Sequence, residues 1–392
     1  MSRFLLVVPP LVGHINPAVA VARELTRRGH EVAWAGTPGI VGELAGPDAE
    51  IHACDAPDDL RRPPELRGVA ALRFLWQDFL GPLALAMAPG VERAAAAFRP
   101  DVIVADQQAL AGALVAERLG IPYATSATTS AEFSAVLGGM PKVEAWIDDL
   151  LAGLRGTLGD PGRTHDPRFS PDLVLAFTTT ALMGEYAAPP QTRFVGPALT
   201  RRPGTAPFPR ERLDPGRHTV LVSLGTANTD LGARFLTECA AAVRDRSRHL
   251  QAVIADPGGV LGGTSDDAVL AVRRMPQLDL LSRASAVVCH AGHNTVAESL
   301  LHGVPLVVAP IRDDQPVIAA QVTSAGAGIR IRFGRGDRRT IGAALDGVLT
   351  LPQYRAAARH VQESFRAAGG AAAAAAHLEE LAITRQGEPG SP

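Results

Sequence analysis

A short stretch from residue 290 to residue 299, HAGHNTVAES, gathers side chains that can hold an anion or a diol. The apolar run before it predicts a strand, Gly292 permits a tight turn, and Asn294 or Thr295 is expected to cap the helix that follows. The free N–H groups and the positive dipole end of such a helix suit a phosphate group. His290 and the hydroxyl of Thr295 can donate further hydrogen bonds there, so the stretch predicts a phosphate site.

Glu298 lies one turn further along this expected helix, on the face of Asn294 by the i, i+4 spacing. A carboxylate at that depth is poorly placed to touch a phosphate, but it can accept hydrogen bonds from a ribose diol. His290 and His293 also suggest a metal, yet they straddle a tight turn with no third ligand at zinc spacing, so no metal site is predicted. An ordinary strand-to-helix junction with a polar cap is the alternative.

Further polar loops are expected at the same edge of the sheet. They are Gly225 and Thr226 at the end of 218–226, Met275 to Gln277 ahead of a helix, and Asp313, Asp314 and Gln315 after 304–310. The carboxyl ends of parallel strands meet at one edge, where doubly wound sheets bind their ligands. Phosphate donors, a diol acceptor and a carboxylate–amide pair together fit a nucleoside diphosphate linked to a sugar.

The elements that must position these groups alternate between short β-rich runs and amphipathic helical segments. In the first half the strands are 3–10, 31–37, 101–106 and 122–127, and the helices are 16–30, capped by Asn16 with Pro17 in its first turn, parts of 68–98, and 109–120. Residues 131–158 are predicted to form a helical flap or wall rather than core. This alternation is typical of a parallel sheet covered by helices on both faces.

The alternation stops at 199–217, which is rich in Pro, Gly and Arg and predicts a linker. It then restarts with strands and helices through 218–333, a helical end at 351–383 and a disordered tail at 384–392. The sequence therefore predicts an α/β protein with two doubly wound domains, 1–198 and 218–383, and a binding site in the cleft between them.

Composition excludes several classes of protein. The 392 residues carry a formal net charge of −2, so nucleic acid and anionic membranes are not expected partners. No apolar run nears the roughly 20 residues of a membrane span, and no signal peptide is apparent, so a cytoplasmic location is expected. Cys54, Cys239 and Cys289 have no disulfide or metal-ligand spacing. Lys142 is the one lysine, so a phosphate loop of the G-x-x-x-x-G-K-[ST] type is absent, and a Schiff base would have to use Lys142.

The segments MPQ (275–277), HAGHNTVAE (290–298), GVPLVVAP (303–310) and DDQ (313–315) resemble the nucleotide-sugar signature of family 1 glycosyltransferases. These enzymes have the GT-B fold and include bacterial natural-product and plant small-molecule glycosyltransferases. GHINP at 13–17 is similar to an element of the family's N-terminal domain. The resemblance implies an acceptor-binding domain at 1–198 and a donor-binding domain at 218–383, whose last helix crosses back to the first domain.

The resemblance assigns roles on the donor side. His290 matches a histidine on the diphosphate, Asn294 and Thr295 complete the phosphate site, Glu298 binds the ribose, Asp314 and Gln315 grip the hexose hydroxyls, and Thr226 is the small phosphate-loop residue. Met275, Gln277 and Gly292 belong to the same signature. Two positions depart from it: Arg274 stands where plant members stack a tryptophan on the base, and His293 stands where they have another tryptophan, so His293 is expected to act through its backbone.

On the acceptor side, His14 is similar to the family's catalytic base, and Asp106 matches the aspartate that pairs with it. His14 is expected in the first strand-to-helix loop, where a near-neutral imidazole can take a proton from an attacking hydroxyl. The resemblance also implies that apolar side chains of this domain line the acceptor pocket, although core helix faces would account for about half of them. These side chains are Phe74, Trp76, Phe79, Phe133, Met140 and Trp146.

The function predicted is metal-independent, inverting transfer of a hexose from UDP-glucose to a hydroxyl of a hydrophobic small molecule, with no cofactor. A dTDP-deoxysugar donor is the first alternative, because Arg274 replaces the stacking residue. A nucleotide-sugar epimerase of the same fold and a catalytically silent auxiliary protein are others. A hydride-transferring enzyme would need G-x-G-x-x-G after a strand, which PPLVGHINP lacks. No pattern indicates an oligomeric state.

Overall fold

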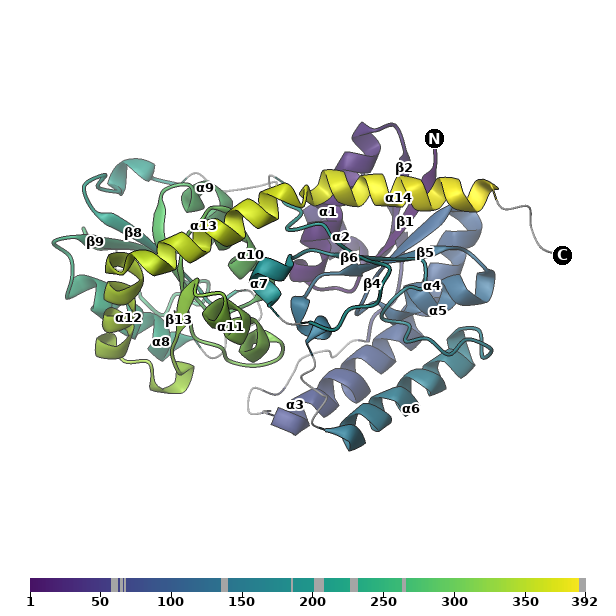
Figure 1. The fold of residues 1–392 in the computed structure, drawn as a ribbon, viewed down its shortest axis with the longest axis horizontal. Helices are drawn as coiled ribbons and strands as arrows, with labels where there is room; N and C mark the ends of the chain where they lie inside the picture. Colours follow the sequence, from purple (N-terminus) through teal and green to yellow (C-terminus); the bar gives the residue numbers. More distant parts are fainter. Residues whose placement is uncertain are drawn as a thin grey trace. The chain divides into compact units, whose positions relative to one another are not determined.

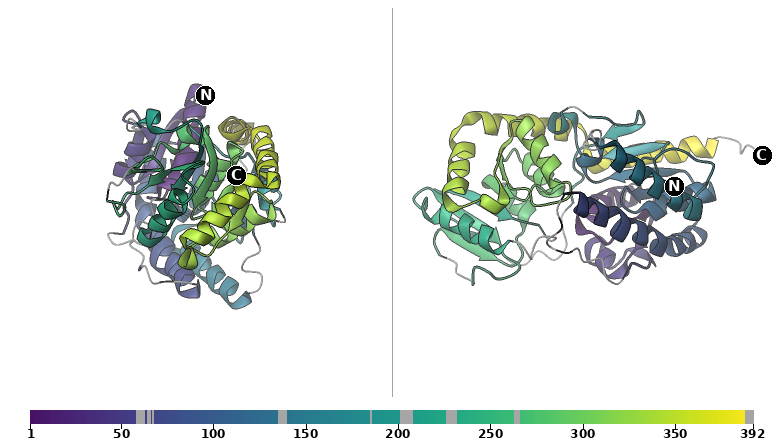
Figure 2. Two further views of the ribbon diagram at one scale, coloured as in Figure 1. Left: turned by 90° about the vertical axis from the view of Figure 1, so that its left-hand side faces the viewer. Right: turned by 90° about the horizontal axis from the view of Figure 1, so that it is seen from below.

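The computed structural model describes residues 1–57, 63, 66, 68–134, 140–184, 186–200, 208–225, 232–262 and 266–387. The chain divides into unit 1, comprising 1–178, 186–203 and 368–392, and unit 2, comprising 179–185 and 204–367. Each unit is a parallel sheet with helices on both faces (Figures 1 and 2). The predicted α/β class with two doubly wound domains is confirmed.

The described part of unit 1 holds a seven-stranded parallel sheet in the order β3-β2-β1-β4-β5-β6-β7. The strands are β1 (Arg3–Val7), β2 (Glu31–Gly36), β3 (Glu50–Ala53), β4 (Val102–Asp106), β5 (Tyr123–Ala127), β6 (Leu173–Ala176) and β7 (Thr192–Phe194). All residues of β4 and β5 are buried, as expected for central parallel strands. The order reverses direction beside β1, so the ends of β1 and β4 lie at the switch point where such sheets bind ligands.

Helices cover both faces of this sheet. They are α1 (Val12–Arg27), α2 (Pro38–Ala45), α3 (Gly68–Arg73), the π-helix η1 (Phe74–Leu80), α4 (Gly81–Phe98), α5 (Leu110–Leu119), the 3-10 helix η2 (Ser130–Phe133), α6 (Pro141–Leu158) and α14 (Gly370–Gly387). Because side chains alternate along a strand, Leu5 and Val7 face the core under α4 to α6, whereas Phe4 and Leu6 face the core under α1, α2 and α14.

Helix α1 starts earlier than the sequence suggested. It begins at Val12 with Leu11 as N-cap, no side chain caps it, and Pro17 lies inside it, so the predicted start at Asn16 is wrong. His14 is therefore in the first turn of a helix rather than in a loop. The backbone N–H groups of His14 and Ile15 both donate to the carbonyl of Leu11, so the first turn is closed by backbone hydrogen bonds without a capping side chain.

Helix α6 belongs to the core of unit 1 instead of forming a flap. Ile147, Leu151, Leu154 and Leu158 are buried in the same cluster as α4 and α5. Their spacing of three to four residues places them on one face of the helix. Gly153 and Gly156, which suggested that the helix would be interrupted, face open space, and α6 runs through them without a break.

The helical run Gly68–Phe98, formed by α3, η1 and α4, is long and apolar enough to cross a membrane by length and composition. We expected no stretch of that kind. In the structure, Leu83, Met87 and Val91 of α4 are buried in the core against the sheet, which accounts for much of the apolar character of the run.

The described part of unit 2 holds a six-stranded parallel sheet in the order β10-β9-β8-β11-β12-β13. The strands are β8 (His218–Ser223), β9 (Leu250–Ala255), β10 (Val269–Val272), β11 (Ala284–Cys289), β12 (Leu306–Val308) and β13 (Gly328–Arg330). The helices are α7 (Thr180–Met183), η3 (Arg210–Arg212), α8 (Ala233–Arg244), α9 (Gln277–Leu281), α10 (His293–Leu301), α11 (Gln315–Ser324), η4 (Phe333–Arg335), α12 (Arg338–Thr350) and α13 (Pro352–Ala367). Again the order reverses at the central strands, here β8 and β11, so their carboxyl ends mark the switch point.

Part of the expected linker is fastened to unit 2, and part of the expected tail is helical. Residues 201–207 of the linker lie outside the described part, but the backbone of Asp214 exchanges two hydrogen bonds with the amide of Gln251, which fastens that segment to unit 2. At the other end, α14 continues to Gly387, where the tail was expected from residue 384.

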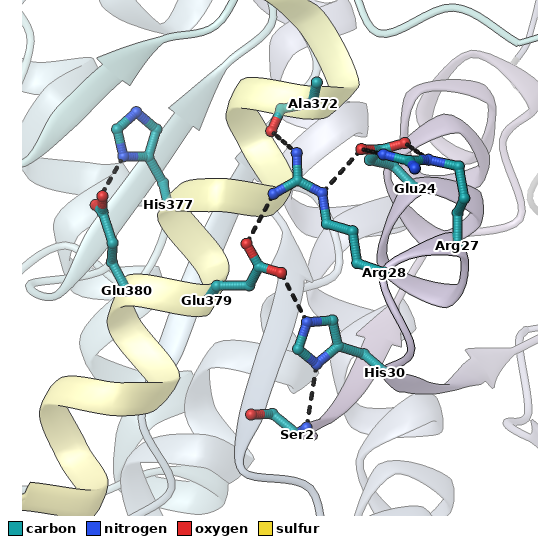
Figure 3. Close-up of polar contacts among 9 residues, drawn as sticks. All are labelled: Ser2, Glu24, Arg27, Arg28, His30, Ala372, His377, Glu379 and Glu380. Carbon is teal, nitrogen blue, oxygen red and sulfur yellow. Dashed lines mark hydrogen bonds and ion pairs between the residues drawn. The ribbon is translucent and has the colours of Figure 1, made fainter.

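Helix α14 belongs to unit 1, although it follows unit 2 in the chain. Ala374, Ala375 and Leu378 are buried in the core beside α1. Glu379 accepts hydrogen bonds from Arg28 at 2.7 Å and from His30 at 2.8 Å, and Arg28 also donates to the carbonyl of Ala372 (Figure 3). Hydrogen bonding from His30, followed by that from Arg28, holds the pKa of the Glu379 carboxyl below its usual value.

We expect Glu379→Gln to lower the free energy of unfolding by roughly 0.5–1 kcal/mol at neutral pH, the range of partly exposed ion pairs. Because the folded-state pKa of Glu379 is lowered, its contribution is fully present above the unfolded-state value and is lost as pH falls through the folded-state value. The difference between wild type and variant should therefore shrink in acid. Urea denaturation at several pH values, with amide hydrogen exchange in α14, measures it.

Glu380→Gln is the matched control, because Glu380 pairs with His377 of the same helix and not with α1 (Figure 3). It should change neither stability nor exchange in α14. Equal effects of the two substitutions would mean that Glu379 does not fasten this helix.

Candidate active site

The predicted base and its partner meet in unit 1. His14 Nδ1 lies 2.9 Å from Asp106 Oδ1, where α1 begins beside the carboxyl end of β4. The Asp106 carboxylate is fully buried, and its Oδ1 also accepts the backbone N–H of Gln108. The imidazole of His14 is 16% exposed, so it can be reached from solvent while the carboxylate behind it cannot.

This geometry selects one tautomer of His14. A carboxylate without a proton only accepts hydrogen bonds, so the short contact to Asp106 requires the proton on Nδ1. The lone pair of a neutral imidazole is then on Nε2. A histidine oriented in this way can take a proton from a hydroxyl at Nε2, while the buried carboxylate stabilises the imidazolium that forms.

Thr128 is a third member of this cluster that the sequence did not single out. Its hydroxyl lies 2.7 Å from His14 Nδ1 and donates to Asp106 Oδ2 at 3.0 Å. The residue follows β5 in the run YATSATTS, where hydroxyl residues are frequent. That enrichment after a buried strand was the available signal, but it does not indicate which hydroxyl faces β4.

The aromatic side chains expected to line the acceptor pocket have mixed positions. Trp76 and Phe79 are buried in the core of unit 1, and Phe74 and Trp146 are partly buried against the same core. Phe133 is buried beside Phe169 and Phe194, and Met140 is the partly exposed residue before α6. Packing alone therefore accounts for Trp76, Phe79 and Phe133. Lys142 lies on the exposed first turn of α6.

In unit 2, residues 290–292 form the turn between β11 and α10, and residues 293–299 belong to the helix. The helix begins at His293 with Gly292 as N-cap and no side chain caps it, so the expected cap by Asn294 or Thr295 is wrong; both lie within its first turn. Ala291 has a φ of 65°, a conformation that costs an alanine energy and is found where a tight turn is functionally constrained. The turn leaves the first N–H groups of α10 without side-chain capping, as a phosphate site requires.

The imidazole of His290 sits against two glycines. A Cβ on Gly225 would lie 2.7 Å from its Cε1, and a Cβ on Gly292 would overlap its Nε2. His290 is buried, and burial lowers its pKa, while the nearby carboxylate of Asp314 acts in the opposite direction. Its Nδ1 has no hydrogen-bond partner among the described residues. A neutral, buried imidazole of this kind can donate one N–H to a ligand oxygen.

Glu298 lies on the buried face of α10, one turn inside the helix. Its Oε2 accepts a hydrogen bond of 2.6 Å from Nε2 of Gln277, the first residue of α9. The structure therefore brings together Gln277 and Glu298, which the sequence placed on separate segments of one site. Met275 lies two residues before Gln277 and is half-buried.

The Asp314–Gln315 pair opens α11 at the carboxyl end of β12. Gln315 is buried, and its side-chain oxygen accepts the backbone N–H groups of Ile311 and Arg312, which shapes the loop. Asp313 has a φ of 58°, a second strained residue at this edge of the sheet. Asp314 is the N-cap residue of α11.

The remaining predicted donor residues divide as follows. His293 is buried as the first residue of α10, and Arg274, at the position of the expected base-stacking residue, is exposed. Thr226 lies outside the described residues. His290 and Glu298 thus belong to the β11–α10 segment, and Gln315 belongs to the next one, β12–α11, at the carboxyl edge of the unit 2 sheet.

Known proteins are similar to this chain over nearly its whole length. The family described as "Glycosyltransferase family 28 N-terminal domain" matches residues 12–137, and the family described as "UDP-glucoronosyl and UDP-glucosyl transferase" matches residues 201–363. The 4'-demethylrebeccamycin synthase of Lentzea aerocolonigenes is 30% identical, over 93% of this chain and 96% of that protein.

Two solved structures are also similar. The crystal structure of the glycotransferase of kitacinnamycin has a TM-score of 0.81 and 25% identity, covering 97% of this chain and 98% of that one. The spinosyn rhamnosyltransferase SpnG complexed with thymidine diphosphate has a TM-score of 0.77 and 24% identity, covering 96% and 100% of the two chains.

The likeness covers both parallel-sheet units. The 30% identical relative spans both units, so the likeness is not confined to one of them. The chain belongs to the family 1 glycosyltransferases of the GT-B fold, the group that includes the bacterial natural-product glycosyltransferases.

Proposed function

We propose that this glycosyltransferase moves a hexose from UDP-glucose to a hydroxyl of a hydrophobic small molecule, with inversion at the anomeric carbon and without a metal ion. The observation that carries the proposal is the His14–Asp106 pair, in which Nδ1 is engaged at 2.9 Å and Nε2 has the lone pair. A base of this kind can activate an acceptor hydroxyl for direct attack on the anomeric carbon.

In this reaction the acceptor oxygen attacks the anomeric carbon while its proton passes to Nε2 of His14. The bond from that carbon to the phosphate oxygen breaks, and both of its electrons leave with UDP. A single displacement of this kind inverts the anomeric centre. Negative charge on the leaving UDP is met by the N-terminus of α10 and by His290, which supports a reaction without a metal.

The choice of UDP rests on Glu298. Its carboxylate is buried beside Gln277 at the edge where the sugar nucleotide is expected, and it can accept hydrogen bonds from both hydroxyls of a ribose. A deoxyribose offers only one of the two. The dTDP alternative is supported by the SpnG structure, which holds thymidine diphosphate on the same fold.

We expect UDP to bind about tenfold more tightly than dTDP, the effect of one hydrogen bond to a charged group. Isothermal titration calorimetry with each diphosphate measures the difference. Glu298→Gln, which weakens the carboxylate as an acceptor, should bring the two affinities closer together. Tighter binding of dTDP by the wild type would exclude the UDP assignment.

The acceptor proposed is an aromatic or polyketide-like natural product. This rests on apolar side chains of unit 1 that are only partly buried, among them Phe74 and Trp146, and on relatives named for rebeccamycin and kitacinnamycin. A mass-spectrometric screen of UDP-glucose and dTDP-sugars against such aglycones, with EDTA present, tests the proposal. Glycosylated product with UDP release that depends on acceptor is expected; UDP release without acceptor would favour the epimerase alternative.

A cytoplasmic location is part of the proposal. Cys54, Cys239 and Cys289 are all buried free thiols, which is the usual state in a reducing compartment. Fractionation of the native host, with nucleotide-sugar-dependent activity as the marker, tests the location.

A further inference from the structure

We propose that Thr128 is a positioning residue for catalysis, which holds the imidazole of His14 and the carboxylate of Asp106 in the arrangement that makes His14 a base. The inference deepens the proposed function and rests on it. Thr128 reaches both groups at once, because its hydroxyl lies 2.7 Å from His14 Nδ1 and 3.0 Å from Asp106 Oδ2.

The three short contacts in this cluster admit one distribution of protons. Asp106 accepts at both oxygens, so the hydroxyl proton of Thr128 goes to Oδ2 and the Nδ1 proton of His14 points at Oδ1. The Nδ1–H of His14 then makes a bifurcated hydrogen bond, with Asp106 Oδ1 and the hydroxyl oxygen of Thr128 as its two acceptors. Any other placement leaves two acceptors facing each other without a proton between them.

Burial makes this arrangement matter. Thr128 is 4% exposed and Asp106 is 2% exposed. If the Thr128 hydroxyl were removed, water could not easily take its place, and Asp106 Oδ2 would lose a hydrogen bond. The hydroxyl also ties together elements that are far apart in sequence: the first turn of α1, the end of β4 and the residue after β5. A side chain in this position acts through His14 rather than on the substrate.

The neighbouring Ser126 shows that a buried hydroxyl at this end of β5 does not by itself contact His14 or Asp106. Ser126 is the register partner of Asp106 in the β4–β5 pairing and is equally buried. Its Oγ nevertheless has no hydrogen-bond partner within the described part of the chain. Ser126→Ala is therefore a matched control, which removes a buried hydroxyl two residues from Thr128 without touching the cluster.

The first test observes His14 directly and needs no substrate. In the full chain labelled with ¹⁵N-histidine, the hydrogen-bonded Nδ1–H of His14 should give a downfield proton resonance, assigned by its absence in His14→Gln. Thr128→Val should move this resonance upfield or broaden it, and Thr128→Ser and Ser126→Ala should leave it in place. An unchanged resonance in a folded Thr128→Val protein would overturn the proposal. Thr128→Ala serves the same purpose if the valine variant does not fold.

The second test uses turnover of UDP-glucose with 4-nitrophenol, which is largely ionised in mild alkali, and with benzyl alcohol, which is not. Thr128→Val should lower kcat for benzyl alcohol by about tenfold, leave KM for UDP-glucose unchanged and have little effect with 4-nitrophenol, because an ionised acceptor needs no base. Thr128→Ser should restore most of the lost rate. A raised KM for UDP-glucose with unchanged kcat would overturn the proposal, because Thr128 would then contact the donor.

Failure of the inference and failure of the proposed function give different results. If His14→Ala abolishes turnover but Thr128→Val changes neither the resonance nor kcat, only the role of Thr128 is wrong. If Thr128→Val moves the resonance while His14→Ala keeps normal turnover, the geometry holds but His14 is not the base.

Discussion

Replacing His14 by alanine should lower kcat by roughly 10²–10⁴-fold, the usual contribution of a general base, and leave UDP binding nearly intact. The separation follows from the structure. His14 and Asp106 belong to unit 1, whereas His290 and Glu298 belong to unit 2. Measuring kcat with benzyl alcohol and UDP affinity by calorimetry checks both halves of the expectation.

Asp106→Ala should cause a smaller loss of kcat in the same direction, because the carboxylate orients His14 and stabilises its protonated form. The double variant should be little worse than His14→Ala, since residues that act as one unit are not additive. His52→Ala is the matched control: this histidine lies on the edge strand β3 and contacts Glu50, away from the cluster. Near-normal turnover in His14→Ala would exclude it as the base, and loss of UDP binding would reverse the assignment of donor and acceptor units.

Much of the fold follows from hydrophobic alternation, because strands buried on both faces read as short apolar runs. VIVAD of β4 is of this kind and was predicted within one residue, and ASAVVC of β11 is the apolar run that predicted a strand before residue 290. Helix starts were less predictable. Both α1 and α10 begin without a capping side chain, so Asn16, Asn294 and Thr295 pointed to starts that the backbone does not use.

The residues of the candidate site could be predicted where a short sequence segment contains both the functional side chain and the elements that position it. His290 and Glu298 follow from a strand, a turn and a helix of known periodicity. Thr128 could not be predicted, since its role depends on how β5 aligns with β4: Ser126 pairs with Asp106, and Thr128 is two residues further on the same side. That register is a property of the assembled sheet. The burial of Trp76 and Phe79 in the core could not be predicted either, because the sequence pattern of an aromatic helix face is the same whether the face lines a pocket or packs in a core.

Replacing His290 by alanine should weaken binding of UDP by about 10–100-fold, the cost of a lost hydrogen bond to a charged phosphate, and should lower turnover at the same time. The imidazole is buried between Gly225 and Gly292, and burial lowers its pKa, so it is neutral at neutral pH and donates without adding a positive charge. The affinity lost should therefore vary little with pH above neutrality. Calorimetric titration with UDP at two pH values, together with kcat, measures this.

Gly292→Ala should displace the same imidazole by a steric clash, because the new Cβ would overlap Nε2 of His290. It should reproduce most of the loss of UDP affinity while leaving the histidine present. His218→Ala is the control, because His218 is an exposed histidine at the opposite end of β8 in the same sheet. Should both His290→Ala and Gly292→Ala bind UDP as the wild type does, the diphosphate lies elsewhere, and the turn between β11 and α10 is only a strained connection in the fold.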